Sequence, residues 1–244
     1  MIDSTARIAK NTIIGKNVAI GAYTIIHSGV SIGDNSIIGP FCELGVSCSG
    51  MGRHVLKIGK DSIIRSHSVF YKNSIFGKSL STGHAVIVRE NTQSGPGLQV
   101  GCNSEIQGHC TFGRFVKMQS NVFIPQGTKL GNFVWIMPGV CFTNDPFPPS
   151  NIRKGSSVGD YACVGAGALI LPGVHIGTDS LVAAHSCVTR NVAAHSVVAG
   201  VPAKRFKNID EIYLDKEKTI RAYPWRRHFH SKYPAFEIKK MKKK

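Results

Sequence analysis

The sequence lacks three features that would point to an exported or membrane-bound protein. No apolar run approaches the roughly 20 residues that a membrane-spanning helix needs. The first residues run directly into a polar, patterned stretch without a signal segment. The seven cysteines are an odd number, and no CxxC pair is present. We therefore expect reduced thiols, no membrane span and a cytoplasmic location.

Acidic residues are scarce, because 14 Asp and Glu stand against 30 Lys and Arg, which gives a net charge of +16. The lysine-rich end at 239–244 favours solubility. The remaining positive charge predicts attraction of polyanionic small molecules. Nucleic acid is not an expected partner, because no nucleic-acid-binding module is recognisable and basic residues do not alternate with aromatic ones.

What the chain has instead is an apolar residue at every sixth position. The series run over 8–44, 58–142 and 158–188 and contain 28 positions, of which only Thr82 and Ser94 are not apolar. At 42% hydrophobic content, chance would give about 12 apolar positions. The pattern is therefore a structural repeat.

A period of six fits neither a helix nor a simple strand, but it fits a coil with flat faces of six residues each. Glycine often follows the apolar residue, and we expect it there because corners need unusual backbone angles. The fourth residue after the apolar one is small or β-branched, as at Thr12 and Ala162. This restriction predicts a second inward position, at which Cys42, Cys48 and Cys110 fall as structural thiols.

These features resemble the hexapeptide repeat of left-handed parallel β-helix proteins, most of which are acyltransferases. The resemblance implies an all-β fold with about nine coils, stacked at about 4.8 Å per strand into a prism about 45 Å long. Each coil buries its core only against its neighbours, so the prism is one domain. We expect this domain over 1–206. A C-terminal helix and basic tail follow over 207–244, with the helix at 209–221 and the aromatic, basic segment 223–236 packed over the prism end.

The repeat is interrupted twice. The step from Leu44 to Ile58 is 14 residues, and the step from Phe142 to Val158 is 16. These interruptions predict loops near 46–57 and 146–157. A loop that leaves a rigid scaffold beside polar residues is a common way to build a site.

The segment 200–204 (GVPAK) ends the repeat and resembles the closing motif of hexapeptide acyltransferases. The resemblance implies that Lys204, with Arg205, lies near coenzyme A, where a cation suits the phosphates. The adjoining coils would contact the same cofactor through Gly165, Ala166, Ala183 and Ala184. In the alternative interpretation, Pro202 only stops the coil and Lys204 is solvated.

Three further segments, STGHAVIVREN at 81–91, MQSN at 118–121 and FTND at 142–145, resemble a narrower group. Similar segments occur in bacterial N-acyltransferases that act on nucleotide-linked amino sugars for surface polysaccharides. The resemblance covers about 60–235 and implies a dTDP- or UDP-linked amino sugar as acceptor. It also implies acetyl-coenzyme A or another acyl-coenzyme A as donor, no metal, and a homotrimer with sites between subunits.

Steps of 18 residues stack side chains on one face, and this rule groups the candidate residues. Asn103 lies above Asn121, with His84 one coil earlier and Gln119 on the same face. Two more ladders fall on an adjacent edge, and they run Asn91, His109, Gly127, Asp145 and Glu90, Gly108, Gln126, Asn144. Together the ladders predict a cleft wall beside the 146–157 loop, unless these corners are polar only because they face solvent.

The resemblance assigns the roles. The catalytic residues would be His84, Asn103 and Asn121, and the substrate-binding residues Glu90, Asn91, His109, Gln119, Asn144 and Asp145. A histidine with a pKa near 6.5 can accept the proton of an attacking amine. Alternatively, His84 only positions the sugar while Asn103 and Asn121 hold it. A backbone N–H would stabilise the oxyanion.

Three other functions remain open from the sequence. An O-acetyltransferase would use a sugar or serine hydroxyl as acceptor. A metal-dependent hydratase similar to γ-class carbonic anhydrase would need three converging histidines. No obvious pair of histidines with four residues between them lies near the middle of the chain. A non-catalytic trimeric scaffold would not need the three polar segments. The acceptor sugar, its amine and the acyl chain cannot be read from the sequence.

Overall fold

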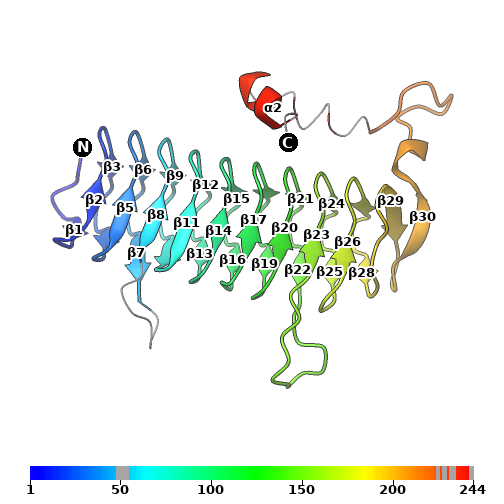
Figure 1. Cartoon of the computed structure of the whole chain (residues 1–244), viewed down its shortest axis with the longest axis horizontal. Helices are drawn as coiled ribbons and strands as arrows, with labels where there is room; N and C mark the ends of the chain where they lie inside the picture. Colours follow the sequence, from blue (N-terminus) through cyan, green and yellow to red (C-terminus); the bar gives the residue numbers. More distant parts are fainter. Residues whose placement is uncertain (48–54, 224–225, 227–229, 231–234, 242–244) are drawn as a thin grey trace.

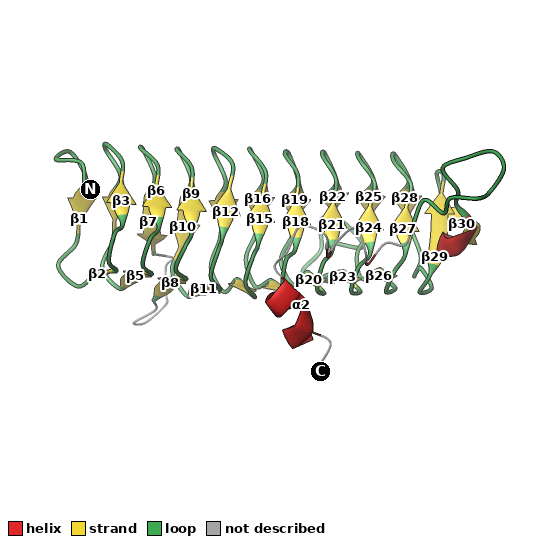
Figure 2. Ribbon diagram, turned by 90° about the horizontal axis from the view of Figure 1, so that it is seen from above, coloured by secondary structure: helices red, strands yellow, loops and turns green. Residues whose placement is uncertain are grey.

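The structure, a computed structural model, describes residues 1–47, 55–223, 226, 230 and 235–241. The chain winds into a left-handed parallel β-helix whose three faces are sheets of ten, nine and eleven strands (Figures 1 and 2). Most strands have only two residues, because each face uses six residues and the rest form corners. The predicted fold class is therefore confirmed.

The strands are assigned to the three sheets as follows. The ten-stranded sheet contains β1 (Arg7–Ile8), β4 (Ile25–Ile26), β7 (Glu43–Val46), β10 (Val69–Tyr71), β13 (Ile87–Val88), β16 (Glu105–Ile106), β19 (Phe123–Ile124), β22 (Cys141–Phe142), β25 (Leu169–Ile170) and β28 (Cys187–Val188). The nine-stranded sheet contains β2 (Ile13–Ile14), β5 (Val30–Ile32), β8 (Leu56–Ile58), β11 (Ser74–Phe76), β14 (Gln93–Ser94), β17 (Thr111–Phe112), β20 (Lys129–Leu130), β23 (Ser157–Val158) and β26 (His175–Ile176). The eleven-stranded sheet contains β3 (Ala19–Ile20), β6 (Ile37–Ile38), β9 (Ile63–Ile64), β12 (Ser81–Thr82), β15 (Gln99–Val100), β18 (Lys117–Met118), β21 (Trp135–Ile136), β24 (Cys163–Val164), β27 (Leu181–Val182), β29 (Ser196–Ala199) and β30 (Lys204–Asn208).

The register confirms the step of 18 residues. Thr82 pairs with Val100, and Val100 pairs with Met118. The register lengthens only where the two loops are inserted, as between Cys141 and Leu169. Both interruptions follow strands of the ten-stranded sheet, β7 and β22, and the second loop projects away from the prism after β22 (Figure 1). Residues 48–54 of the first predicted loop lie outside the described residues.

The prism has three edges, which we name by what they carry. The groove edge follows the strands of the eleven-stranded sheet, for example at 83–85 and 101–103. The loop edge follows the ten-stranded sheet, for example at 89–91. The C-terminal edge follows the nine-stranded sheet, for example at 113–115.

The glycines that follow the apolar positions have a different cause from the one predicted. They do not adopt left-handed backbone angles, with the exception of Gly45 among the described residues. Instead, a Cβ on Gly113 would lie 2.6 Å from the Gly131 carbonyl carbon and 2.7 Å from Asn132 N, so successive coils approach too closely for a side chain. The left-handed residue comes two positions later, as at Asn103.

The second inward position is confirmed, and its hydroxyl groups hold the coils together. Thr24 is fully buried, and its hydroxyl donates to the Gly39 carbonyl at 2.7 Å. The same Oγ1 accepts a hydrogen bond from the backbone N–H of Cys42 on the next coil, at 3.1 Å. Serine and threonine are therefore tolerated in the core because they satisfy their own polar atoms.

The cysteines of the described chain are free thiols. Cys42 and Cys110 are buried at the predicted inward position, whereas Cys48 lies outside the described residues. Burial raises the pKa of the Cys110 thiol to about 11 and that of the Cys163 thiol to about 12. Both thiols are therefore uncharged at neutral pH and pack as small apolar groups.

The predicted helix at 209–221 is wrong. The structure has one 3-10 turn, η1 (Ile209–Glu211), followed by an antiparallel bridge between Tyr213 and Arg221. Asp215 closes this loop, because its carboxylate accepts hydrogen bonds from the backbone N–H groups of Thr219 and Ile220 at 2.8 and 2.7 Å. Such local capping competes with a helix. The hydrogen bonds from Thr219 lower the pKa of Asp215 to about 2.

The sequence predicted that the aromatic, basic segment 223–236 packs over the prism end, but two of its described residues contact the side of the prism. Arg226 forms an ion pair with Asp179 at 2.6 Å, and His230 hydrogen-bonds the Tyr161 hydroxyl at 3.0 Å. Both contacts lie on the C-terminal edge. Helix α2 (Ala235–Met241) consequently lies at the level of the middle coils (Figures 1 and 2). The predicted domain boundary at 206 stays a prediction.

The close approach of the coils predicts a large difference between two glycine substitutions. Gly113→Ala is expected to lower the free energy of unfolding by about 3 kcal/mol, because its Cβ overlaps the next coil. Gly139→Ala is expected to cost about 1 kcal/mol, because its φ of 70° disfavours alanine but the nearest atom is 3.9 Å away. Denaturant unfolding of both variants measures this difference, and equal losses would contradict the stacking argument.

Candidate functional site

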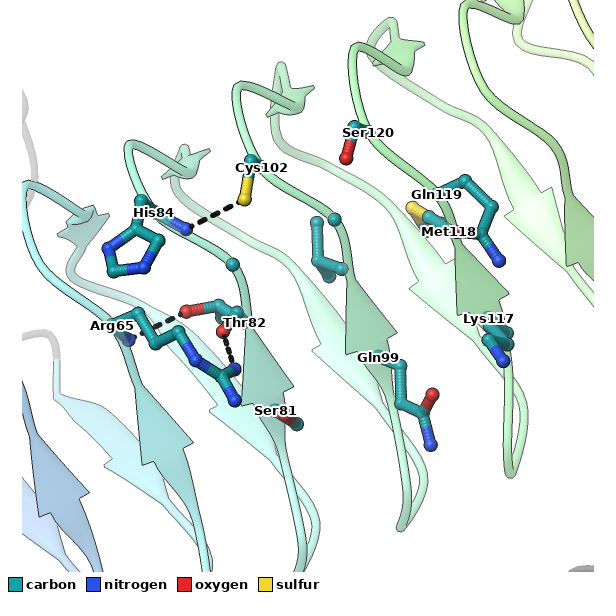
Figure 3. Close-up of a pocket in the computed structure, with 13 residues that line it drawn as sticks. Arg65, Ser81, Thr82, His84, Gln99, Cys102, Lys117, Met118, Gln119 and Ser120 are labelled. Atoms are coloured by element: carbon teal, nitrogen blue, oxygen red, sulfur yellow. Dashed lines mark hydrogen bonds between the residues drawn. The ribbon is translucent and has the colours of Figure 1, made fainter.

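A groove of about 400 Å³ runs along the groove edge, over β12, β15 and β18 and the turns that follow them (Figure 3). Its lining residues are Arg65, Ser81, Thr82, Gly83, His84, Gln99, Val100, Gly101, Cys102, Lys117, Met118, Gln119 and Ser120. Two of them are cations, and none of these described lining residues is a carboxylate. The groove therefore favours an anionic ligand.

His84 is the histidine of this groove, and its ring is exposed. The Ser66 hydroxyl and Nδ1 of His84 are hydrogen-bonded at 2.8 Å, which orients the ring from the preceding coil. The backbone N–H of His84 donates to Sγ of Cys102 at 3.3 Å (Figure 3). No described residue is a hydrogen-bond partner of Nε2, so this nitrogen is available to a ligand.

Asn103 and Asn121 occupy the left-handed corner position, with φ of 56° and 58°. Both are exposed, and neither belongs to the groove lining. The backbone N–H of Asn103 donates to the carbonyl of His84 at 2.9 Å, so Asn103 lies beside the groove. Asparagine is favoured at φ > 0 whatever the function. The structure thus supplies a conformational reason for both residues, next to the role that the sequence predicts.

Gln119 lies in the groove, as the sequence arithmetic predicted. Arg65, Cys102 and Lys117 were missed. Arg65 follows Ile64 at the same position as Gln119 follows Met118, so the period of six was a signal that could have found it. Its guanidinium donates to the Thr82 carbonyl at 2.5 Å. Nζ of Lys117 lies 5.0 Å from the centre of the Trp135 ring.

The other candidate residues lie on the loop edge, one face away from the groove. Asn91 and His109 form a ladder there, with Nδ2 and Nε2 3.2 Å apart. Asn144 donates from Nδ2 to the Gln126 carbonyl at 3.3 Å, which continues the neighbouring ladder. One chain alone therefore does not bring this set together with His84. They are separated because every six residues the chain turns from one face of the prism to the next, so residues 89–91 lie one edge away from residues 83–85.

Glu90 is buried on the loop edge and carries a charge partner. Its carboxylate accepts hydrogen bonds from Arg89 at 3.1 and 3.2 Å. Nη1 of Arg89 also donates to Oε1 of Gln107 at 3.4 Å, and its guanidinium lies 5.8 Å from the Tyr71 ring centre. Glu90 is thus part of a polar network on the ten-stranded sheet.

Asp145 organises the second loop. Its carboxylate accepts hydrogen bonds from the backbone N–H groups of Phe147 and Ser150 at 3.0 and 2.9 Å, and from the Ser150 hydroxyl at 2.5 Å. Arg153 adds an ion pair at 3.2 Å. The hydrogen bonds from Ser150, followed by smaller effects, lower the pKa of this carboxyl. Asp145 therefore holds the loop at its base.

The residues predicted to bind coenzyme A lie on the same edge as His84. Gly165 and Ala166 follow β24, and Ala183 and Ala184 follow β27. These strands are four and five steps from β12 in the eleven-stranded sheet, which is about 19 and 24 Å along the prism. Lys204 and Arg205 lie on β30, which pairs antiparallel with β29 at the end of this sheet. Both cations are exposed.

Two family descriptions match this chain. "Bacterial transferase hexapeptide (six repeats)" matches residues 11–45, and "Hexapeptide repeat of succinyl-transferase" matches residues 156–190. Both matched segments are hexapeptide repeats of the kind found in these transferase families. These matches cover coils near both ends of the prism.

Among curated proteins, bifunctional protein GlmU of Listeria welshimeri is 26% identical over 191 residues, which are 75% of this chain and 38% of the relative. A 2,3,4,5-tetrahydropyridine-2,6-dicarboxylate N-acetyltransferase of Clostridium perfringens is 45% identical over 73 residues, 30% of each chain. The chain thus matches less than half the length of these relatives. The solved Arabidopsis UDP-N-acetylglucosamine acyltransferase shares the fold, with a TM-score of 0.65 at 17% identity over 85% of this chain and 74% of that one.

Two further observations concern the described part of the chain. No three His, Cys, Asp or Glu side chains within it converge in a way that would hold a metal ion. No helix in the same residues is long and apolar enough to cross a membrane.

Proposed function

We propose that this protein transfers an acyl group, with acetyl as the first choice, from coenzyme A to the amine of a nucleotide-linked amino sugar. The observation that carries the proposal is the groove edge. A histidine held by Ser66 and a terminal strand bearing Lys204 and Arg205 lie along one continuous edge. The Clostridium perfringens relative is an N-acetyltransferase by name, which supports an amine as the acceptor. A dTDP- or UDP-linked sugar for surface polysaccharides is the acceptor that we propose.

The chemistry needs a neutral amine, a stabilised oxyanion and a thiolate leaving group. In the proposed mechanism His84 accepts the amine proton through Nε2, while Ser66 holds the ring through Nδ1. The amine attacks the thioester carbonyl, and the tetrahedral intermediate collapses to an amide and the coenzyme A thiol. Gln119 lies in the groove and Asn103 lies beside it, where both amides can orient the sugar.

The residues toward β30 fit the donor. Coenzyme A carries several phosphate charges, and Lys204 and Arg205 supply exposed positive charge at the end of the sheet. Glycine and alanine at 165, 166, 183 and 184 leave little side-chain volume along the edge between that end and His84. An extended donor would therefore place its thioester toward the groove.

The sugar-binding role of the loop edge requires a second copy of the chain. The outward residues of the nine-stranded sheet are mostly polar, as at Lys57, Gln93 and Lys129. Those of the ten-stranded sheet include Val69, Ile87, Phe123 and Leu169. Apolar faces of this kind favour contacts between subunits. We propose a homotrimer in which the loop edge of one copy faces the groove of the next.

The function is tested by thiol release from acetyl-coenzyme A with a panel of dTDP- and UDP-linked amino sugars. Thiol release is expected with an amino sugar nucleotide and not with the matched sugar nucleotide that carries a hydroxyl in place of the amine. Release with the hydroxyl compound would indicate O-acetylation. His84→Ala is expected to lower kcat roughly a hundredfold or more, because proton transfer is lost. Ser66→Ala is expected to lower it about tenfold, because the ring loses its support.

The same assay distinguishes the two roles of His84. If His84→Ala raises only the KM for the sugar nucleotide and leaves kcat unchanged, the base role is wrong and His84 positions the sugar. If no amino sugar nucleotide supports thiol release while a hydroxyl acceptor does, the proposed N-acyl transfer is wrong.

The donor assignment predicts a selective effect of Lys204→Ala. This substitution is expected to raise the KM for acetyl-coenzyme A about tenfold, because a charged hydrogen bond to phosphate is lost. The KM for the sugar nucleotide should not change. Lys129→Ala is the matched control, since Lys129 is an exposed lysine on the nine-stranded sheet. Equal effects of the two substitutions would remove Lys204 from the donor site.

The trimer is tested by mass and by mixing. Sedimentation equilibrium is expected to give three times the 26.4 kDa of one chain. His84→Ala and His109→Asn chains, each of low activity, are expected to regain part of the activity when they are unfolded and refolded together. This follows because some mixed trimers then contain one intact site. A monomer mass, or no recovery, would count against a shared site.

A further inference from the structure

A row of three stacked rings lies uncovered on the groove edge. Tyr23, Phe41 and His67 occupy successive left-handed corner positions, one coil apart. The Tyr23 and Phe41 ring centres are 5.3 Å apart with planes at 14°, and those of Phe41 and His67 are 5.1 Å apart at 20°. Tyr23 is 60% exposed and Phe41 50%, which is unusual for two large rings in contact.

A second row of stacked rings, on the C-terminal edge, is partly covered by other side chains and serves as a comparison. Phe115, Phe133 and Tyr161 occupy the corner positions of the C-terminal edge, with centres 5.3 and 4.9 Å apart. Here His230 packs edge-on against Phe133 and Tyr161, and Arg226 lies 4.8 Å from the Tyr161 ring centre. Phe133 is only 1% exposed. Arg226 and His230 therefore cover part of the second row, whereas Tyr23 and Phe41 of the first row keep at least half of their surface exposed among the described residues.

The open row ends where the groove begins. The next corner position after His67 is Ala85, which has a φ of 54°. Alanine gains nothing in this backbone region. The chain otherwise mostly uses asparagine, aspartate, glycine or a ring there, with Ser79 and Lys218 as the other exceptions. A residue that breaks a local rule in this way is expected at a functional position. Because a methyl group stands where a fourth ring would stack, the face of His67 toward Ala85 is left without a ring neighbour from that coil.

One turn connects this row with the groove. Arg65 lines the groove, Ser66 holds the ring of His84, and His67 ends the row of rings. A planar ligand on His67 would thus lie next to both the cationic groove and the histidine. Arg65, two residues before His67, supplies charge for a phosphate group beside the ring.

We propose that the open face of His67, backed by Phe41 and Tyr23, binds the base of the nucleotide substrate at the level of Ala85. This inference rests on the proposed function, since it identifies the nucleotide end of the same site. Aromatic stacking accepts any base, because every base has a π face. The row therefore contributes affinity for the nucleotide, and the choice between uracil and thymine depends on other contacts.

The test measures binding of UDP and dTDP to the full chain by isothermal titration calorimetry. His67→Asn removes the ring, and asparagine suits the backbone angle, as at Asn103. It is expected to weaken both nucleotides about tenfold. Ala85→Phe fills the free position with a ring that this chain already accepts at Phe115, where φ is also 54°. It is expected to abolish nucleotide binding while the affinity for inorganic pyrophosphate is retained.

The control is Phe236→Ala on α2, another phenylalanine that is more than half exposed, and it is expected to bind both nucleotides like the unaltered chain. Unchanged nucleotide affinity in both His67→Asn and Ala85→Phe would overturn the proposal. A loss of oligomer mass in place of nucleotide affinity would also overturn it, because the row would then be a subunit contact.

The two proposals fail separately. If an amino sugar nucleotide is acylated but the ring variants bind UDP and dTDP normally, the stacking site is wrong and the proposed function stands. If UDP or dTDP binds in a ring-dependent way but no amino sugar nucleotide is acylated, the stacking site stands and the acyl transfer is wrong. The KM for acetyl-coenzyme A, expected to be unchanged in both ring variants, shows that the donor end is intact.

Discussion

The structure depends on backbone hydrogen bonds between successive coils, which hold residues 18 apart at a fixed separation. Gly101 N donates to the Met118 carbonyl at 2.9 Å, and the same step recurs along the prism. At this separation the residue after each apolar position has almost no room for a Cβ, and the corner must take left-handed backbone angles two residues later. These two demands explain the glycines and the asparagines, and the fixed separation brings rings at successive corner positions into contact. They also determine which side chains can lie together, because the side chains stacked above one another along the prism are those 18 residues apart, except across the inserted loops.

Much of this architecture could be predicted, because a six-residue period is a local property that a single sequence displays. The three faces, the register of Thr82 on Val100 and the inward position of Cys42 all follow from counting. The reason for the glycines does not follow from counting, because the close approach between coils is a contact between residues 18 apart and not a property of the turn. The helix expected at 209–221 failed for a similar reason. Asp215 captures backbone N–H groups locally, which charge patterning does not reveal.

For the candidate site, the sequence could predict only on which face or edge of the prism each residue lies. Counting by 18 placed Gln119 in the groove, and it assigned His109 to a different edge from His84. Counting did not identify the partners of each side chain. The bond from Ser66 to His84 and the loop closure by Asp145 depend on side-chain directions. The resemblance to sugar N-acyltransferases named residues on two edges that one chain keeps apart. That separation explains why a second copy enters the proposed site, although nothing in the repeat itself requires one.

The reversal at β30 has a consequence for solubility. A stack of identical parallel coils ends in unpaired N–H and C=O groups, to which another prism could add and so begin a fibre. β30 runs antiparallel to β29 and occupies this open end of the eleven-stranded sheet. A further prism arriving there meets a strand of opposite direction, with the exposed charges of Lys204, Arg205 and Lys207. The strand that carries the proposed donor cations therefore also blocks the end-to-end addition of another prism at this sheet.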